Sequence, residues 1–530
     1  MAVVSQFPTA VATSDPPRPA VPFTSILCEG PDSVPPGQAA TRPECFHDLG
    51  LDQIVDAVVA PWKDYDLAGF FHVNLSNTDA VVYRQEVMRD LERAEVMTVI
   101  RAFAKRMREM RQELPLAAKR YNTHERNRWH LGAVQRYVEA IETLRDDLAP
   151  LALRSRGLSR WRDYVGGYAD SPTFLRLTAH TGQVLRELSM VAYAVTIDGA
   201  TVVVRRYAGE TNYAAEIEET FAKFRRGAVK SYLAKLPVTA GLNHIEAQVL
   251  DRVARLHPDV FGSLAAFRAE HEHFVDECVA RFEREIHFYI GWLDFIAPFR
   301  SGGLSFCYPA VSASKAISVR DAFDLALARR LLPEDKTVVC NDFALAGQER
   351  IFVVTGPNQG GKTTFARLFG QLHWLASLGC ATPGSDAKLA LFDRMFAHFE
   401  REEDIHNLRG KLHDDLVRMH RILAQATPSS IVVMNEIFSS TTLRDAVFLG
   451  REVLLRLNRL DLLAVCVTFL DELASGDAKV VSLVAGIDPV DPAARTFKLE
   501  RRRADGLAHA MAIAEKYHVT ESWLKKRIPA

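Results

Sequence analysis

A stretch of small and basic residues, VVTGPNQGGKTTFARL at residues 353–368, contains the residue types that hold a polyphosphate. It fits the spacing GxxxxGK[ST] and has one more threonine directly after it. The residues are Gly356, Pro357, Asn358, Gln359, Gly360, Gly361, Lys362, Thr363 and Thr364. Glycines let backbone N–H groups curl around phosphate oxygens, and the amino end of a following helix adds partial positive charge. We expect ATP as the ligand, with Lys362 reaching its β- and γ-phosphates and the Thr363 hydroxyl holding Mg²⁺.

The alternative for this stretch is a glycine-rich turn that contains a lysine by chance. The residues on either side argue against it. An apolar run at 351–355 predicts a strand, and the pattern at 361–378 predicts a helix. A phosphate-binding loop requires this context of strand, loop and helix.

A second apolar run, SIVVMNEIF, ends in Asn435 and Glu436. In ATPases with this loop, an Asp at such a strand end supports Mg²⁺, and a following Glu can polarise the attacking water. Asn435 keeps an oxygen but loses the charge, so we expect it to support the metal weakly, through water. Glu436 is the expected general base, and Glu436 and Lys362 are the predicted catalytic residues. The alternative is a solvated Glu at a strand end. A third apolar run, at 462–469, ends in Phe469, which cannot donate a hydrogen bond to phosphate.

The bulk composition limits the class of protein. The chain has 530 residues, is 48% hydrophobic and 25% charged, and has a net charge of −1, so any DNA contact must come from a local basic face. Its seven cysteines are scattered without a CxxC pair, which favours a reducing compartment. No apolar run reaches the roughly 18 residues that cross a bilayer, and the first residues do not resemble a signal peptide. We therefore expect a cytoplasmic protein with no membrane partner.

The periodicity of apolar residues predicts the elements that position these residues. Residues 1–22 are expected to form a disordered lead, and 23–80 a small segment with a helix at 51–59. A long helix from Val82, with an apolar stripe through Leu114, is followed by helices at 127–148 and 171–192. Two β-type runs at 191–209 flank Asp198-Gly199, a pair that favours a tight hairpin turn. Helices at 214–236 and 243–300 end the helical region.

From residue 306 onwards the pattern alternates between strand and helix. We expect strands at 351–355, 430–434 and 462–467, helices at 361–378, 411–425 and 445–457, and a strand pair at 479–486 and 494–502. A final helix is predicted at 508–517. Such alternation is typical of an α/β domain with a largely parallel sheet.

Four stretches resemble the MutS family of ABC-type ATPases in order and spacing: TGPNQGGKTT (355–364), DRMF (393–396), VVMNEIFSSTT (432–442) and VTFLDEL (467–473). VYRQEVMRDLE (82–92) is similar to the opening helix of the family's lever domain. The resemblance implies a multidomain chain. An all-α lever or core domain at 81–305, with a short β-hairpin clamp near 191–236, would precede a P-loop ATPase domain at 306–530.

The sequence departs from the family pattern at three places. Asn435 replaces the family's Walker B Asp, Phe469 replaces its switch His, and NLRGKLHDD (407–415) replaces its Ser-Gly-rich signature loop, where only Gly410 matches. The chain before the levers is about 80 residues, shorter than the family's two N-terminal domains. Direct mismatch reading through the family's Phe-containing wedge is therefore not expected.

Basic residues with interleaved aromatic side chains could contact DNA. The basic residues are Arg101, Lys105, Arg106, Arg108, Arg111, Lys119, Arg120, Arg126, Arg128, Arg154, Arg156, Arg160 and Arg162. The aromatic residues are Trp129, Trp161 and Tyr164. A second possible contact, at the hairpin, comprises Arg205, Arg206, Arg225, Arg226 and Lys230. The alternative is a solvated helix face balanced by Glu109, Glu113 and Glu125.

Together with the resemblance, these patterns predict a MutS-related ATPase that binds mismatched, looped or branched duplex DNA and dimerises through its ATPase domains. ATP binding would move the levers, and the role would be in DNA repair or recombination. The alternative is a nucleotide-switched module that binds a protein partner and hydrolyses ATP slowly or not at all. Asn435 and Phe469 favour that alternative.

Overall fold

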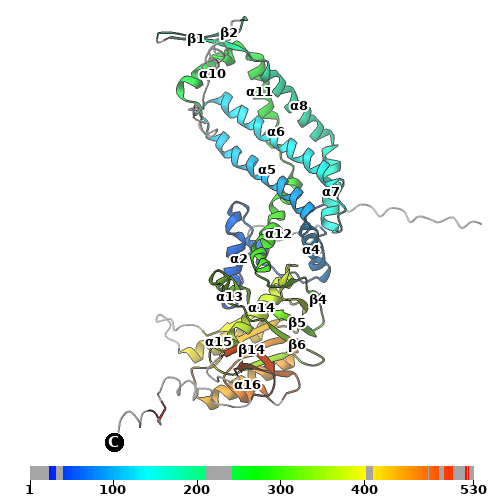
Figure 1. Cartoon of the computed structure of the whole chain (residues 1–530), viewed down its shortest axis with the longest axis vertical. Coiled ribbons are helices and arrows are strands. Elements are labelled where there is room, and N and C mark those ends of the chain that lie inside the picture. Colours follow the sequence, from blue (N-terminus) through cyan, green and yellow to red (C-terminus); the bar gives the residue numbers. More distant parts are fainter. Residues whose placement is uncertain are drawn as a thin grey trace, which may run out of the picture.

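The computed structural model describes residues 23–30, 40–199, 201–209, 241–400, 410–475, 477–488, 495–504, 520, 521 and 523. The molecule is elongated, with a helical arm (α4 to α12) above an α/β unit (Figure 1). Among the described helices, none combines the length and apolar character needed to cross a bilayer. The predicted lead at 1–22 and the predicted helices at 214–236 and 508–517 lie outside the described residues.

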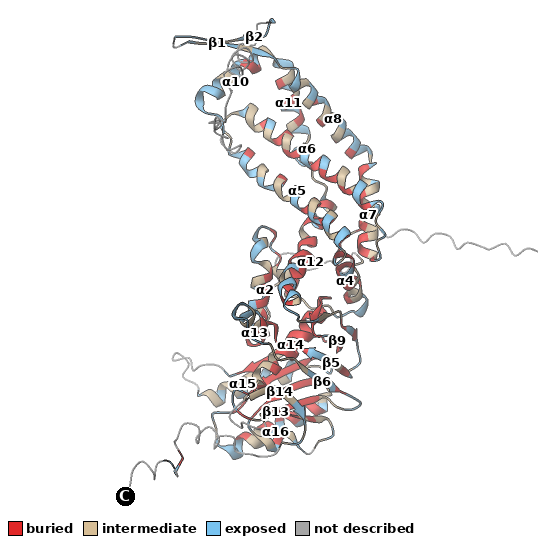
Figure 2. Cartoon of the chain, viewed as in Figure 1, coloured by how far each residue is buried: buried red, intermediate tan, exposed pale blue. Residues whose placement is uncertain are grey.

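The helical arm consists of long helices that pack side by side (Figure 1). Its helices are α4 (Thr78–Leu91), α5 (Ala94–Ala118), α6 (Thr123–Leu148), α7 (Arg156–Ala169), α8 (Pro172–Ser189), α10 (His244–Leu256), α11 (Pro258–Glu270) and α12 (Glu277–Ser301). Side chains at the amino ends fix where several of them begin: Asn122 caps α6, Ser155 caps α7 and Asp276 caps α12. Buried residues recur along most of these helices, between intermediate and exposed ones (Figure 2).

The long helix predicted from Val82 to Leu114 was wrong, because the chain forms two helices there. Helix α4 ends at Leu91, and Arg93 takes an extended backbone conformation before α5 begins. The Arg93 guanidinium fixes this break by donating to Glu95 and to the carbonyl of Ala152. The apolar period runs through the break because both helices bury the same stripe in one core. The single helix predicted at 243–300 was also wrong, because the chain forms three helices there, α10, α11 and α12. Their buried apolar residues belong to one core, so the apolar period does not reveal the breaks.

The hairpin predicted at 191–209 is confirmed as β1 (Tyr193–Asp198) and β2 (Thr201–Arg206). Asp198 pairs with Thr201 across the ladder, so the turn begins at Gly199, one residue later than predicted. Gly199 has a φ of +58°, which glycine adopts without steric cost.

The α/β unit is built on a six-stranded sheet in the order β10-β11-β12-β7-β13-β14, parallel except for β14. Its strands are β7 (Ile351–Thr355), β10 (Met395–Phe399), β11 (Ile431–Asn435), β12 (Leu463–Val467), β13 (Val480–Ile487) and β14 (Arg495–Arg501). Strands β7, β11 and β12 are buried along their whole length, as expected for parallel strands covered on both faces. The prediction of a largely parallel sheet is confirmed.

Helices cover both faces of this sheet. Helix α14 (Lys362–Ser377) shares a core with Val433 and Val465 on one face. Helices α15 (Lys411–Gln425) and α16 (Leu443–Leu460) share a second core with Val432 and Met434 on the other. The alternation of core membership along β11 is the period of two expected for a strand.

The remaining elements lie between the sheet and the arm or at its margins. The helices are α1 (Cys45–Leu49), α2 (Leu51–Val59), η2 (Ala60–Tyr65), α3 (Ala68–Phe71), α13 (Leu325–Leu331), η3 (Leu332–Glu334) and η4 (Asp471–Ala474). Strands β4 (Ala310–Ser312), β9 (Asp386–Ala390), β5 (Ile317–Ala322) and β6 (Asn341–Leu345) form one small sheet, and β3 (Phe306–Cys307) pairs with β8 (Thr382–Pro383). The helix predicted at 51–59 is confirmed as α2.

Helices α1 to α3 connect the sheet to the arm. The Gln371 side chain of α14 donates to the carbonyl of Leu49 at 2.9 Å, and the Trp374 indole donates to the carbonyl of Phe71 at 2.9 Å. Helix α2 in turn packs on α12 of the arm. The helix that follows the glycine-rich loop is therefore linked to the arm through rigid elements.

Candidate nucleotide-binding site and basic face

The candidate site lies at the carboxyl edge of the six-stranded sheet. Strand β7 ends at Thr355, the glycine-rich loop spans 356–361, and α14 begins at Lys362. The neighbouring strands β11 and β12 end at Asn435 and Val467, and parallel pairing brings all of these ends to the same edge. Ligands of open α/β sheets bind at such an edge.

The glycines of the loop are required by its backbone and by the strand packed against it. Gly356 and Gly361 have φ values of +114° and +92°, which side-chain-bearing residues rarely adopt. A Cβ on Gly360 would lie 2.9 Å from the Cβ of Ala485 in β13. Gln359 also has a positive φ, of +60°. The sequence thus specifies a loop whose backbone is free to face a bound phosphate.

The Lys362 side chain folds back over the loop. Its ammonium donates to the carbonyls of Gly356 at 2.9 Å and Pro357 at 3.1 Å, and the residue is only 4% exposed. The ring of Phe469 covers it, with the Nζ atom 4.1 Å from the ring centroid. Burial lowers the pKa of Lys362 to about 8, and the nearby Glu436 carboxylate opposes that shift. The ammonium is therefore held inside the loop by groups that a phosphate could replace.

Thr363 and Asn435, which the sequence predicted as metal-binding residues, lie in contact. The Thr363 hydroxyl donates to the Asn435 side-chain oxygen at 2.9 Å. This leaves the lone pairs of the hydroxyl oxygen available to a cation, and oxygen atoms are the ligands that Mg²⁺ prefers. The residues present fit a magnesium ion bound by Thr363, with Asn435 orienting that ligand from behind.

Glu436 follows β11 in a strained conformation. Its φ is +56°, and its N–H donates to the carbonyl of Val467 at 2.9 Å. Burial raises the pKa of the Glu436 carboxyl, and the charge of Lys362 opposes the shift. Phe438, two residues later, also has a positive φ. Backbone strain of this kind concentrates at functional sites, and the Glu436 carboxylate lies close enough to Lys362 for the two charges to interact.

Two neighbours of the loop were not predicted from the sequence. The contact of the Phe469 ring with the Lys362 ammonium was not foreseen, because only the fold brings the two side chains together. Arg495 of β14 donates to the carbonyl of Asn358 at 3.3 Å. Gly410 directly precedes α15, whose first residue, Lys411, forms an ion pair with Glu400. Residues 407–409 of the expected signature loop lie outside the described residues.

We expect Asn435→Asp to strengthen the binding of Mg²⁺. A carboxylate would accept the same hydrogen bond from Thr363 and add a negative charge beside the metal. Changes behind a metal ligand alter affinity by about tenfold or more, so the Mg²⁺ concentration that supports half-maximal nucleotide binding should fall on the order of tenfold. The measurement is a magnesium titration of fluorescent-nucleotide binding. Asn77→Asp is the control, because Asn77 is exposed and its side-chain oxygen caps α4, a role that aspartate keeps. An unchanged magnesium midpoint in Asn435→Asp would contradict a position close to the metal.

Several arginines of the predicted basic face form ion pairs within the protein. Arg101 pairs with Asp294, and Arg111 pairs with the buried Glu283 of α12. Arg120 and Arg162 pair with Glu125 and Asp163. Among the basic residues named above, those without an ion pair to any described residue are Lys105, Arg106, Arg108, Lys119, Arg126, Arg128 and Arg154.

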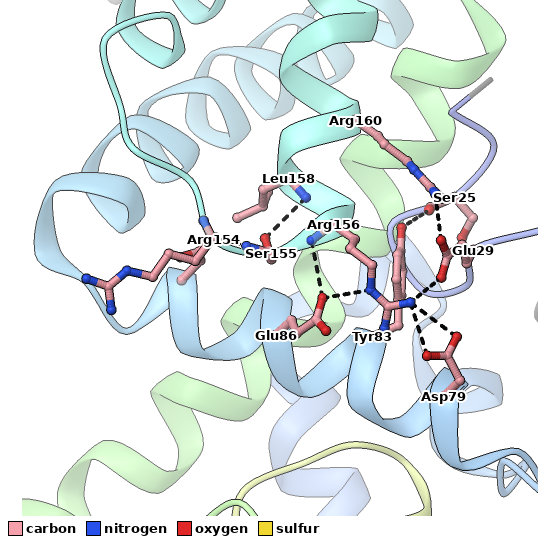
Figure 3. Close-up of polar contacts among 11 residues, drawn as sticks. Ser25, Glu29, Asp79, Tyr83, Glu86, Arg154, Ser155, Arg156, Leu158 and Arg160 are labelled. Atoms are coloured by element: carbon pink, nitrogen blue, oxygen red, sulfur yellow. Dashed lines mark hydrogen bonds and ion pairs between the residues drawn. The ribbon is translucent and has the colours of Figure 1, made fainter. Parts of the chain in front are cut away.

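Arg156 and Arg160 are half-buried and pair with carboxylates, a structural role that the sequence did not predict. Arg156 binds Glu29, Asp79 and Glu86, and so joins the amino-terminal stretch to α4 and α7 (Figure 3). Arg160 adds a second contact to Glu29 at 2.6 Å. The Arg154 side chain extends away from this cluster (Figure 3).

The aromatic side chains predicted to stack on bases are largely in the core, so that prediction was wrong for Trp161. Trp161 is fully buried and stacks on Phe282 with centroids 3.8 Å apart. Tyr164 stacks on Trp161, and its hydroxyl donates to Asp276. Trp129 is half-buried beneath the Arg120 guanidinium. At the hairpin, Arg206 donates to the carbonyl of Leu256, while 225, 226 and 230 lie outside the described residues.

Comparison with known proteins gives one family for the α/β unit. Residues 352–519 match MutS domain V. A DNA mismatch repair protein MutS from Orientia tsutsugamushi strain Boryong is 27% identical over 143 residues, which is 27% of this chain and 16% of the relative. A MutS from Rickettsia rickettsii strain Sheila Smith is 28% identical over 197 residues, 35% of this chain and 22% of the relative. An Endonuclease MutS2 from Gemmatimonas aurantiaca is 30% identical over 207 residues, 38% of this chain and 25% of the relative. Each match thus spans a quarter or less of the relative's length.

Proposed function

We propose, from the premise that this chain belongs to the MutS family through residues 352–519, that it is an ATPase with a role in DNA repair. Mg-ATP binds at the glycine-rich loop, and its arrival changes the position of the helical arm on DNA. The observation that carries the proposal is the Thr363–Asn435 contact of 2.9 Å directly beside the buried Lys362 ammonium. The group proposed for the metal and the group proposed for the phosphates therefore lie at the same edge of the sheet.

Each residue has a separate part in this proposal. The loop residues 356–361 and Thr364 surround the phosphates, and Lys362 neutralises their charge. Thr363 would hold Mg²⁺, whose charge would stabilise the phosphates when bound, and Asn435 holds the Thr363 hydroxyl in place. Glu436 accepts a proton from the attacking water. The chain divides into a segment at 23–80, a lever domain at 81–305 with a clamp near 191–236, and an ATPase domain at 306–530.

The same proposal includes a homodimer through the ATPase domains. The nucleotide would lie between the loop of one subunit and the region around Gly410 of another. The path from the site to DNA runs from α14 through α1, α2 and α3 to α12, as the contacts of Gln371 and Trp374 suggest. The DNA is mismatched, looped or branched duplex recognised by its shape.

The test of this function is ATP hydrolysis with and without DNA. Homoduplex, mismatched and branched DNAs are compared at several salt concentrations, because phosphate contacts make binding fall steeply with salt. Stimulation of hydrolysis by a branched or mismatched DNA supports the proposal. A second candidate, a nucleotide-switched module for a protein partner, is favoured by the Phe469 ring on Lys362 and by the uncharged Asn435. Tight ATP binding with neither turnover nor DNA binding would select the second candidate.

We expect Lys105→Ala to change mainly DNA binding and Arg156→Ala to change mainly stability. Lys105 is exposed on α5 without an ion pair to a described residue, so its loss should lower the salt slope of DNA binding by about 1 and change stability by less than about 0.5 kcal/mol. Arg156 holds three carboxylates, so its loss should cost on the order of 2 kcal/mol of unfolding free energy.

Thermal or denaturant unfolding and a salt titration of DNA binding measure the two effects. The pair is matched, because each variant removes one positive charge from the arm. A change in the salt slope of DNA binding by Arg156→Ala, with unaltered stability, would contradict the structural role of Arg156.

A further inference from the structure

Helices α8 and α11 meet at three side chains that bind metals in proteins. His180 lies in the middle of α8, Glu270 is the last residue of α11, and His271 follows it. The His180 Nδ1 atom lies 3.0 Å from the His271 Nε2 atom and 3.6 Å from a carboxylate oxygen of Glu270. All three ligand atoms lie within 4.8 Å of one another. We call these residues the His–Glu–His cluster.

The local backbone and packing hold the cluster in place. His271 leaves the helical conformation, with φ −110° and ψ 34°, while its N–H still bonds to the carbonyl of Phe267. The Phe267 ring is fully buried and contacts both imidazoles, with centroids 4.9 Å from His180 and 4.7 Å from His271. Glu270 is exposed, so the cluster has a fixed apolar base and an open side towards solvent.

We propose that the His–Glu–His cluster binds a divalent transition metal ion of the zinc class, with water completing the coordination. Ligand atoms at about 2.0–2.1 Å from a tetrahedral zinc ion are roughly 3.3 Å apart. The distances of 3.0 and 3.6 Å from the His180 Nδ1 atom lie on either side of that value, and all three ligand atoms lie within 4.8 Å of one another, so side-chain rotations can bring them to one ion. Two imidazoles and one carboxylate are a ligand set that zinc takes readily.

A bound metal ion would cross-link helices α8 and α11 within the arm. Helix α8 runs into the hairpin strand β1, and α10, which precedes α11, packs against β2. A metal that joins α8 to α11 would therefore fix both supports of the hairpin relative to each other. The cluster is remote in sequence from the glycine-rich loop, so this inference does not depend on the proposed ATPase.

The experiment uses the full chain, stripped with a chelator and titrated with Zn²⁺ in competition with a chromophoric chelator. Wild type is expected to bind one equivalent more than the double variant His180→Ala/His271→Ala. Zn²⁺ should also raise the thermal midpoint of wild type and leave that of the double variant unmoved. His47→Ala is the matched control, because His47 is an exposed imidazole paired with Asp52 far from the cluster. It should retain the full zinc stoichiometry.

A milder variant guards against misfolding. Glu270→Gln changes an exposed side chain and should weaken zinc binding by about tenfold or more while circular dichroism stays unchanged. Equal zinc binding by wild type and the double variant would overturn the proposal. So would a zinc affinity of Glu270→Gln equal to that of wild type. In either case the two imidazoles would only share a hydrogen bond.

Discussion

Glu436→Gln is expected to lower ATP turnover by a factor of about 10²–10⁴, the range that a positioned general base contributes, while Mg-ATP binding stays within about twofold. Glutamine has the same size and meets the same backbone strain at φ +56°, so the substitution removes only the proton acceptor. The hydrogen bond from the 436 N–H to the carbonyl of Val467 is a backbone contact and survives. Steady-state hydrolysis and equilibrium nucleotide binding, measured side by side, separate chemistry from binding.

The pH profile gives the same variant a second readout. Burial raises the pKa of the Glu436 carboxyl, and the base works only when it is deprotonated. Wild-type turnover should therefore fall as the pH falls through that raised pKa, and the residual activity of Glu436→Gln should lack this acid limb. Glu472→Gln, an exposed glutamate in η4, is the control and should keep the wild-type rate and profile. Full turnover in Glu436→Gln would exclude this residue as the base.

The sheet that carries the site could be predicted from sequence because buried parallel strands are continuous apolar runs. Strand 351–355 and helix 411–425 have the predicted bounds, and the other predicted elements of the α/β unit that the structure describes differ by at most three residues at either end. Thr363 and Asn435 were predicted to act together, and the parallel pairing of β11, β12 and β7 explains why they meet.

The arm was harder to predict, because the spacing of apolar residues shows which residues are buried but not where one helix ends and the next begins. The stripe through Val87 and Ile100 continues across the break at Arg93, so the sequence suggested one helix. The same limit applies to single residues. Trp161 lies among arginines in the sequence, and only the fold reveals that it stacks on Phe282, more than a hundred residues away. The contact between Phe469 and Lys362 is of the same long-range kind.

Lys362→Ala is expected to abolish measurable Mg-ATP binding and to lower turnover by about 10²–10³ or more, as the loss of a charge-stabilising donor does. The ammonium lies inside the loop, bound to the carbonyls of Gly356 and Pro357, so a phosphate that enters the loop finds it already in position. Lys388→Ala removes an exposed lysine of β9 and is the matched control. Unaltered thermal unfolding of Lys362→Ala would show that the loss concerns the ligand and not the fold.

The lowered pKa of Lys362 makes this role testable in the wild-type protein. With a pKa of about 8, the free amine is partly neutral at pH 8.5, and a bound triphosphate favours the charged form and raises that pKa. ATP binding between pH 8 and 9 should therefore take up protons, up to about one per site, and affinity should fall as the pH rises above 8. Calorimetry in buffers of different ionisation enthalpy measures the uptake directly. Glu436→Gln should also take up protons on binding ATP but over a lower pH range, because its loss removes a negative charge that raises the pKa of Lys362. Binding with no proton uptake, or undiminished binding by Lys362→Ala, would remove the lysine from the phosphate site and leave the loop without its principal positive charge.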